Sequence, residues 1–108
     1  MNFYLADESG HYDPTADNAY VPDFFVNLFY ESRHELGFSL DVLFDIDPYE
    51  VVKVDDVSTL KEEVEHLMSM PNHIAFARYP YVAEHIEKLN EYLKVAIKEG
   101  KTIISEGD

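Results

Sequence analysis

Residues 80–100 read PYVAEHIEKLNEYLKVAIKEG, which is the most regular pattern in the chain. The apolar residues of this stretch recur at steps of three or four: Val82, Ile86, Leu89, Leu93, and Ala96 or Ile97. Such spacing is typical of an amphipathic helix that packs one stripe of side chains against a core. Pro80 suits the first turn of a helix and Gly100 suits its end. We therefore expect a helix that begins at Pro80 and is closed by Gly100.

Two other stretches have a helical period. Pro22 and Asp23 suit a helix start, and the apolar residues that follow predict a helix over residues 23–36 with Gly37 as its cap. Four of its side chains are expected in the core: Phe25, Leu28, Phe29 and Leu36. A further helix is predicted from the capping pattern Thr59-Leu-Lys-Glu62 to Pro71.

Short apolar runs predict the strands. They lie at residues 2–6, 51–54, 73–78 and 101–105. Residues 7–22 show no periodicity and are rich in turn-forming residues, so they predict a long loop. Loops of this length in a compact domain are often functional.

Residues 38–47 fit two structures. Phe38, Leu40, Val42 and Phe44 alternate with smaller, more polar residues, as in a half-buried strand. A short helix through Leu40, Leu43 and Phe44 fits the same stretch. We favour the strand, which would form a hairpin with residues 51–54 through a turn at 47–50.

These elements predict one α+β domain over residues 1–108, with about three helices packed on a small sheet of three to five strands. A chain of 108 residues, 46% of them hydrophobic, can bury a core without cross-links. The absence of cysteine excludes disulfides and thiolate zinc sites. The N-terminus lacks the basic start and apolar run of a secretion signal. We therefore expect a soluble, cytoplasmic protein.

Net charge limits the class of partner. The chain holds 22 Asp and Glu against 8 Lys and Arg, a formal net charge of −14. Phosphate backbones and anionic membranes repel such a chain, so neither direct nucleic-acid binding nor membrane binding is expected. A basic protein partner fits the sign of the charge. Solubility alone is the other explanation.

The charge is concentrated in the first half of the chain. Residues 1–57 hold 13 acids against two bases, a net of −11, together with 11 of the 15 aromatic residues. Tyr and Phe anchor interfaces while charge steers the approach of a partner. The predicted partner-binding residues are the acids and tyrosines of two segments: Asp7, Glu8, Tyr12, Asp13, Asp17, Tyr20, Asp41, Asp45, Asp47, Tyr49 and Glu50.

The motifs of common catalytic and metal sites are missing from the sequence. Asp45-x-Asp47 begins like a calcium loop, but Glu50 stands where the glycine of the sharp turn belongs. The five histidines form no zinc motif, and no serine lies in a Gly-x-Ser-x-Gly turn. We therefore predict no metal, no cofactor, no small-molecule ligand and no catalytic residue.

In size, acidity, lack of cysteine and α+β pattern, the chain resembles the small bacterial immunity proteins of contact-dependent growth inhibition and other polymorphic toxin systems. The resemblance spans the whole chain and is one of overall character, without a shared motif. It implies a cytoplasmic protein that binds one cognate toxin, often a basic nuclease, and blocks its active site or substrate surface. The alternatives are a nucleic-acid mimic that inhibits a host enzyme, a small enzyme with an acidic site, and a self-associating structural module.

Overall fold

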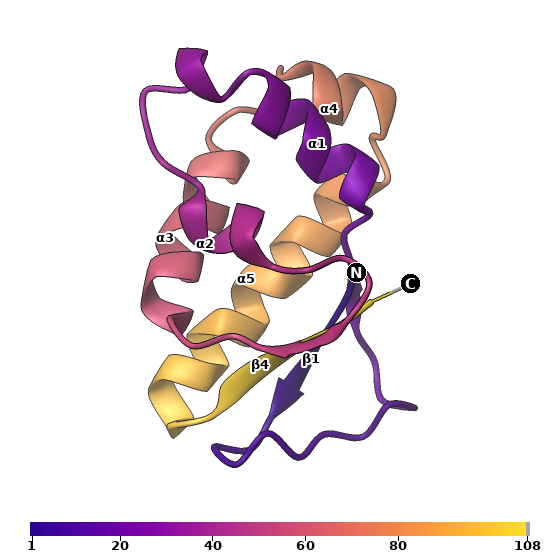
Figure 1. Cartoon of the computed structure of the whole chain (residues 1–108), viewed down its shortest axis with the longest axis vertical. Helices are drawn as coiled ribbons and strands as arrows, with labels where there is room; N and C mark the ends of the chain where they lie inside the picture. The colour runs from indigo at the N-terminus through magenta and orange to yellow at the C-terminus, as the bar shows by residue number, and fades with distance from the viewer. Residues whose placement is uncertain (108) are drawn as a thin grey trace.

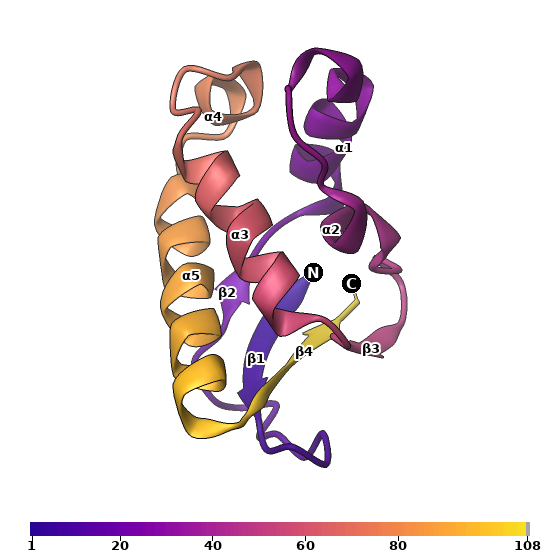
Figure 2. The same cartoon turned by 90° about the vertical axis from the view of Figure 1, so that its left-hand side faces the viewer.

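Four strands form an antiparallel sheet in the computed structural model, which describes residues 1–107. They are β1 (Asn2–Ala6), β2 (Ala19–Tyr20), β3 (Val51–Lys53) and β4 (Thr102–Glu106), in the order β2-β1-β4-β3. Figure 1 labels β1 and β4, and Figure 2 labels all four strands. The longest pairing joins β1 to β4, from Asn2 opposite Glu106 to Ala6 opposite Thr102. The strands predicted at both ends of the chain and at residues 51–54 are confirmed.

Five α-helices lie within the described residues: α1 (Asp23–Glu31), α2 (Asp41–Asp45), α3 (Val57–Met68), α4 (Ile74–Arg78) and α5 (Val82–Glu99). Helix α5 packs on one face of the sheet, and α3 packs against α5 (Figure 2). This arrangement confirms the predicted α+β fold; residue 108 of the predicted domain lies outside the described residues. Of the helices in residues 1–107, none combines the length and the apolar character that crossing a membrane requires.

Helix α5 is the helix predicted from residues 80–100. Its buried stripe contains the expected apolar residues: Val82, Ile86, Leu89, Leu93 and Ala96. Gly100 ends the helix at φ 66°, in the left-handed region that glycine adopts without a steric penalty. This turn lets the N–H of Lys101 donate to the carbonyl of Ala96 at 2.8 Å. The chain then passes directly from α5 into β4.

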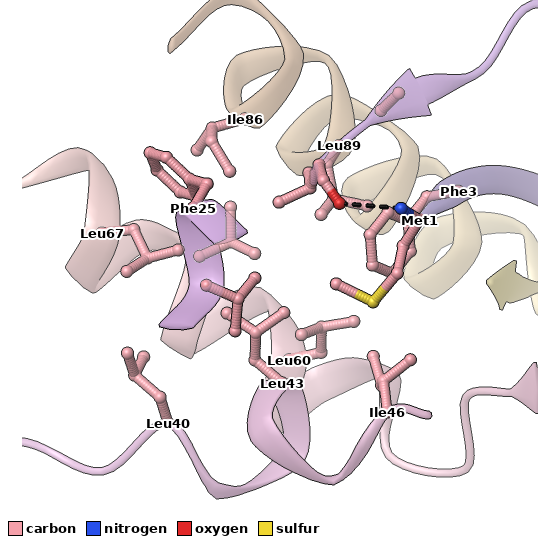
Figure 3. Close-up of a cluster of buried hydrophobic side chains, with 14 of the residues drawn as sticks. Met1, Phe3, Phe25, Leu40, Leu43, Ile46, Leu60, Leu67, Ile86 and Leu89 are labelled. Atoms are coloured by element: carbon pink, nitrogen blue, oxygen red, sulfur yellow. Dashed lines mark hydrogen bonds between the residues drawn. The ribbon is translucent and has the colours of Figure 1, made fainter. Parts of the chain in front are cut away.

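The core lies between the helices and the inner face of the sheet. Figure 3 shows Phe3 of β1, Phe25 of α1 and Leu89 of α5 converging on Leu43 of α2 and Leu60 of α3. Phe25, Phe29 and Leu36 are buried as predicted, while Leu28 is only half-buried. After α1 ends at Glu31, a short 3-10 helix (Arg33–Glu35) carries the chain to Leu36.

The outer face of the sheet is covered by the loop that precedes β2. The ring of Tyr12 packs on Tyr4 of β1, with centroids 5.1 Å apart, and its hydroxyl donates to Glu106 of β4 at 2.7 Å. The Nζ of Lys53 donates to the carbonyl of Glu8 at 3.0 Å. Tyr4 and Ile104 are buried on this face. The predicted loop is therefore part of the packed structure.

The strand predicted at residues 38–47 is wrong, because residues 41–45 form α2. Leu40, Leu43 and Ile46 are buried at helical spacing, and β3 pairs with β4 instead of forming the predicted hairpin. The helix is held at its start by the buried carboxylate of Glu63 on α3, which accepts from the backbone N–H groups of Val42 and Leu43. A contact between residues 20 positions apart therefore decides the structure of this stretch.

The strand predicted at residues 73–78 is also wrong, because residues 74–78 form α4. The Nδ1 of His73 accepts from the backbone N–H of Ala75 at 3.1 Å and so caps this short helix. Its apolar residues Ala75 and Phe76 are buried against α1. The two short helices α2 and α4 raise the helix number from the predicted three to five. Helix α3 also begins earlier than predicted, because Asp56 caps it.

Candidate protein-binding surface

The predicted partner-binding residues fall into two groups that differ in how they are used within the fold. One group lies in or beside the loop between β1 and β2: Asp7, Glu8, Tyr12, Asp13, Asp17 and Tyr20. The other follows α2 and the turn into β3: Asp41, Asp45, Asp47, Tyr49 and Glu50.

Two acids of the loop hold its turns. Asp7 Oδ1 accepts from the N–H of Ser9 and from the N–H of His11, at 3.0 and 2.9 Å. Asp13 Oδ1 accepts from the N–H and the hydroxyl of Thr15, at 2.8 and 2.6 Å. The hydroxyl of Ser9 also donates to Asp7 Oδ1. Hydrogen bonding lowers the pKa of both carboxyl groups, and the largest contribution comes from the Ser9 hydroxyl at Asp7 and from the Thr15 hydroxyl at Asp13. Both residues therefore have a local structural role.

Asp17 attaches the loop to α5. Its carboxylate accepts from Lys88 Nζ at 3.1 Å and from the hydroxyl of Tyr92 at 3.2 Å. These two bonds lower the pKa of Asp17. Burial, and then the bond to Asp17, raise the pKa of Tyr92 to about 12. Asp17 is thus bound to the protein's own cation.

The tyrosines of the first group are also engaged. Tyr12 packs on Tyr4 and bonds to Glu106, which raises the pKa of Tyr12. Tyr20 is half-buried in β2, where its backbone N–H donates to His85 Nδ1 at 3.0 Å and its ring lies edge-on to the same imidazole. Of the first group, only Glu8 has an exposed side chain without a hydrogen bond in residues 1–107.

The acids of the second group are not paired with a cation in residues 1–107, although Asp47 Oδ1 accepts from the backbone N–H of Tyr49 at 2.9 Å. Asp41, Asp45, Asp47 and Glu50 are all exposed, and within residues 1–107 none forms an ion pair with Lys, Arg or His. Apolar surface accompanies them, because Tyr49 is 74% exposed and the neighbouring Val51 is 61% exposed. We name this region, with Asp55, the α2–β3 surface: Asp41, Asp45, Asp47, Tyr49, Glu50, Val51 and Asp55.

Two hollows flank α2. The larger, of about 890 Å³, separates α2 from the end of α1 and is lined by Asp41 and Asp45 together with the rings of Tyr30 and Phe44. Arg33 also lines it, but its guanidinium lies over the Tyr30 ring at 3.9 Å and donates to the Tyr30 carbonyl. Because that cation is held by Tyr30, it leaves the two carboxylates unpaired.

The smaller hollow, of about 220 Å³, lies between α2 and β3, and we name it the β3 hollow. Its apolar lining consists of Val42, Ile46, Val52 and Val54, its acids are Asp45, Asp55 and Asp56, and Lys53 lines it as well. Asp56 is occupied as the cap of α3, whereas Asp45 and Asp55 have no ion pair in the described residues. An apolar lining with free carboxylates suits a long cationic side chain.

Glu63 positions the acids of α2. This residue is 4% exposed, and its Oε1 accepts from the N–H of Leu43 at 2.8 Å while Oε2 accepts from Val42 at 3.1 Å. Burial raises the pKa of Glu63 above its ordinary value, although the two hydrogen bonds act in the opposite direction. Glu63 is not among the residues predicted from the sequence. In the sequence, Glu63 could be recognised as an acid that lies three residues after Leu60, on the apolar stripe of α3.

Within residues 1–107, no three His, Asp or Glu side chains lie close enough together to hold a metal ion. Comparisons with protein-family models, with curated proteins and with solved structures find no match for this chain.

Proposed function

We propose that this chain is an immunity protein, an inhibitor that binds and neutralises a cognate basic toxin domain such as a nuclease. Its α2–β3 surface is the contact region. The observation that carries the proposal is that Asp41, Asp45, Asp47 and Glu50 are exposed and free of ion pairs in the described residues, beside exposed Tyr49. The proposal includes a bacterial source and a cytoplasmic location, where such a toxin would act.

The contrast between the two groups of acids supports this region over the loop. Asp7, Asp13 and Asp17 already accept hydrogen bonds from the protein, and Asp17 is also paired with Lys88, so a partner there would have to share or replace those bonds. Within residues 1–107, the side chains of Asp41, Asp45 and Glu50 accept no hydrogen bond and carry no such cost, while that of Asp47 accepts one from the Tyr49 N–H. They also add to the long-range field that speeds the approach of a basic protein.

Solubility alone explains this surface less well. Charge that serves solubility needs no exposed aromatic or β-branched residue beside it, whereas interfaces combine charged rims with Tyr anchors. Tyr49 and Val51 have the largest exposed fractions among the large hydrophobic residues of the described chain. A nucleic-acid mimic would use the same carboxylates, so the identity of the partner separates that alternative from an immunity protein.

Charge reversal tests the proposal. The protein is tagged and used to capture its partner from the lysate of its native host, and the dissociation constant is then measured with the purified partner. The triple variant Asp41→Lys, Asp45→Lys, Asp47→Lys should weaken binding by about 100-fold or more, because it removes attraction and adds repulsion. A single toxin domain whose activity the protein blocks is the expected partner.

The matched control reverses three exposed acids of α5, of which Glu91 is paired with Lys94: Glu84, Glu87 and Glu91. It changes the net charge by the same amount, so a general electrostatic effect would weaken binding equally in both variants. We expect the α5 variant to bind within about threefold of the original protein. Equal affinity of the α2 variant and the original would remove the basis of the proposal, and a housekeeping nucleic-acid enzyme as partner would favour the mimic.

A further inference from the structure

We propose that the basic partner adds an extended segment as a new strand alongside β3, with its Lys or Arg side chains in the β3 hollow. This inference rests on the proposed function for the charge of the partner, and goes beyond it in stating how the partner binds. Strand addition supplies affinity through main-chain hydrogen bonds and specificity through pockets for alternate side chains.

Strand β3 is a free edge of the sheet. The strand order β2-β1-β4-β3 leaves it with one neighbouring strand, β4. Val51 is 61% exposed and Lys53 is exposed as well. Edge strands present unpaired backbone groups to which another chain can pair.

The register shows which backbone groups of β3 point outward. The backbone carbonyl of Glu50 accepts from the N–H of Gly107 at 3.0 Å, and the N–H of Val54 donates to the carbonyl of Ile103 at 2.9 Å. Glu50 and Val54 therefore direct their backbone N–H and C=O groups towards β4. In an antiparallel pair this orientation alternates along the strand. Val51 and Lys53 therefore direct their N–H and C=O groups away from β4. Within residues 1–107 these outward groups have no hydrogen-bond partner.

The β3 hollow continues inward from this edge. Side chains of an added strand would alternate between the two faces of the sheet, so every second residue would lie over the hollow. A Lys or Arg there would place its aliphatic stem along Val42 and Ile46 and its charge near Asp45 and Asp55. On the outer face, Val51 would contact the intervening residues.

The charge of the β3 edge favours a basic segment over a second copy of this chain. A second copy of this chain paired edge to edge would bring Asp47, Glu50 and Asp55 close to the same residues of its partner, and like charges across a strand pair are destabilising. The ammonium of Lys53, which donates to the carbonyl of Glu8, offsets only one of these three acids. A basic segment meets the opposite condition, because Asp47, Glu50 and Asp55 attract it and outnumber Lys53.

The test is an NMR titration of the ¹⁵N-labelled full chain with a synthetic peptide, Lys-Val-Lys-Val-Lys-Val-Lys. Binding should slow exchange of the Val51 and Lys53 amide protons at least about tenfold, because a partner strand takes up those N–H groups. The matched peptide Glu-Val-Glu-Val-Glu-Val-Glu should cause no change. Amides of β1, which already lie inside the sheet, provide the internal reference.

Variants at Val51 separate backbone pairing from side-chain contact. Val51→Pro removes an outward N–H and no bond to β4, and proline is tolerated on an edge strand, so the fold should persist. We expect Val51→Pro to weaken binding of the basic peptide about tenfold or more, and Val51→Ala, which keeps the N–H, to weaken it less than about threefold. If Val51→Pro does not fold, amide exchange in the unchanged chain still decides the question.

The outcomes also separate this inference from the proposed function. If the basic peptide shifts the resonances of Asp41, Asp45 and Asp47 while the Val51 and Lys53 amides exchange as before, strand addition is overturned and the charged surface stands. Failure of the basic peptide to bind at all overturns strand addition too. Loss of the proposed function shows in a different experiment, as unchanged partner affinity after charge reversal on α2.

Discussion

Glu63 Oε1 lies 2.8 Å from the backbone nitrogen of Leu43, so a buried acid of α3 holds the first turn of α2. The carboxylate stands where the helix presents unpaired N–H groups and a partial positive charge. Since Asp41 and Asp45 project from that same short helix, the position of the α2–β3 surface depends on a residue that no partner would touch. Such an arrangement links binding to the protonation and burial of Glu63.

Glu63 should make stability fall as pH rises. Burial raises the pKa of its carboxyl in the folded state above the ordinary value of 4.5, so the folded state holds more protons than the unfolded state between those two values. The free energy of unfolding therefore decreases with rising pH across that window, and stays lower above it. Glu63→Gln cannot ionise, and should lack this contribution.

Urea unfolding of the original chain and of Glu63→Gln, from about pH 4.5 to 8, checks the expectation. The difference in unfolding free energy, original minus variant, should fall as pH rises from about 4.5. Other titrating groups cancel in this difference. Parallel curves for the two proteins would show that Glu63 has no raised pKa.

His73 should give the opposite pH dependence. Its ring stacks on Phe29, with centroids 3.9 Å apart, and because Nδ1 accepts from Ala75, the proton lies on Nε2 beside Ser32 Oγ at 2.9 Å. Burial lowers the pKa of this imidazole below 6.5, so the unfolded state holds more protons between the folded value and 6.5. Stability should therefore decrease as pH falls below about 6.5.

His73→Asn provides the comparison, because asparagine can cap α4 with an oxygen and does not titrate. Thermal unfolding between about pH 7.5 and 5 should show a midpoint that falls more steeply for the original chain than for the variant. Identical slopes would mean that protonation of His73 does not disturb the cap.

Asp17→Asn should lower the pKa of Tyr92 from its value of about 12. Part of the elevation comes from the Asp17 carboxylate, which bonds to the Tyr92 hydroxyl at 3.2 Å, while the larger part comes from burial and should remain. NMR titration of ring-labelled tyrosine measures the shift. Asp13→Asn is the control, since Asp13 bonds to Thr15, and should leave Tyr92 unchanged.

Leu89→Ala should destabilise the fold by about 2–5 kcal/mol, because Leu89 is fully buried in the main core cluster and its removal leaves a cavity. Ile97→Ala on the same helix is the matched control. Ile97 is 46% exposed, so its truncation should cost about 1 kcal/mol or less. Urea midpoints of the two variants give the comparison, and equal losses would contradict the assignment of Leu89 to the core.

The regular elements could be predicted because their signals are local. The apolar spacing of residues 82–96 and the cap at Gly100 lie within one stretch, and α5 follows them. The two wrong strands, at 38–47 and 73–78, have short apolar runs that fit either period. Residues 41–45 are helical because Glu63, on another helix, accepts from their backbone N–H groups. Residues 74–78 are helical because His73 caps them and their apolar side chains are buried against α1.

The candidate surface could be predicted only in part, because contacts with distant parts of the chain decide which acids stay unpaired. An acid's position in the sequence does not tell whether a cation elsewhere binds it: Asp17 meets Lys88, which is 71 positions away, while Asp45 meets none in the described residues. Partner binding by either group remains a prediction. The structure adds Val51 and Asp55 to it, because exposure and the β3 hollow depend on how β3 lies beside α2.

The pairing of β1 with β4 has a consequence for synthesis of the protein. In the sheet of residues 1–107, β4 lies between β1 and β3 and joins them, yet it follows both of them in the chain. While the ribosome is still translating residues 1–101, β1 has only the two-residue β2 beside it and β3 has no neighbour. Helices form from local contacts, but this sheet must wait for residues 102–106.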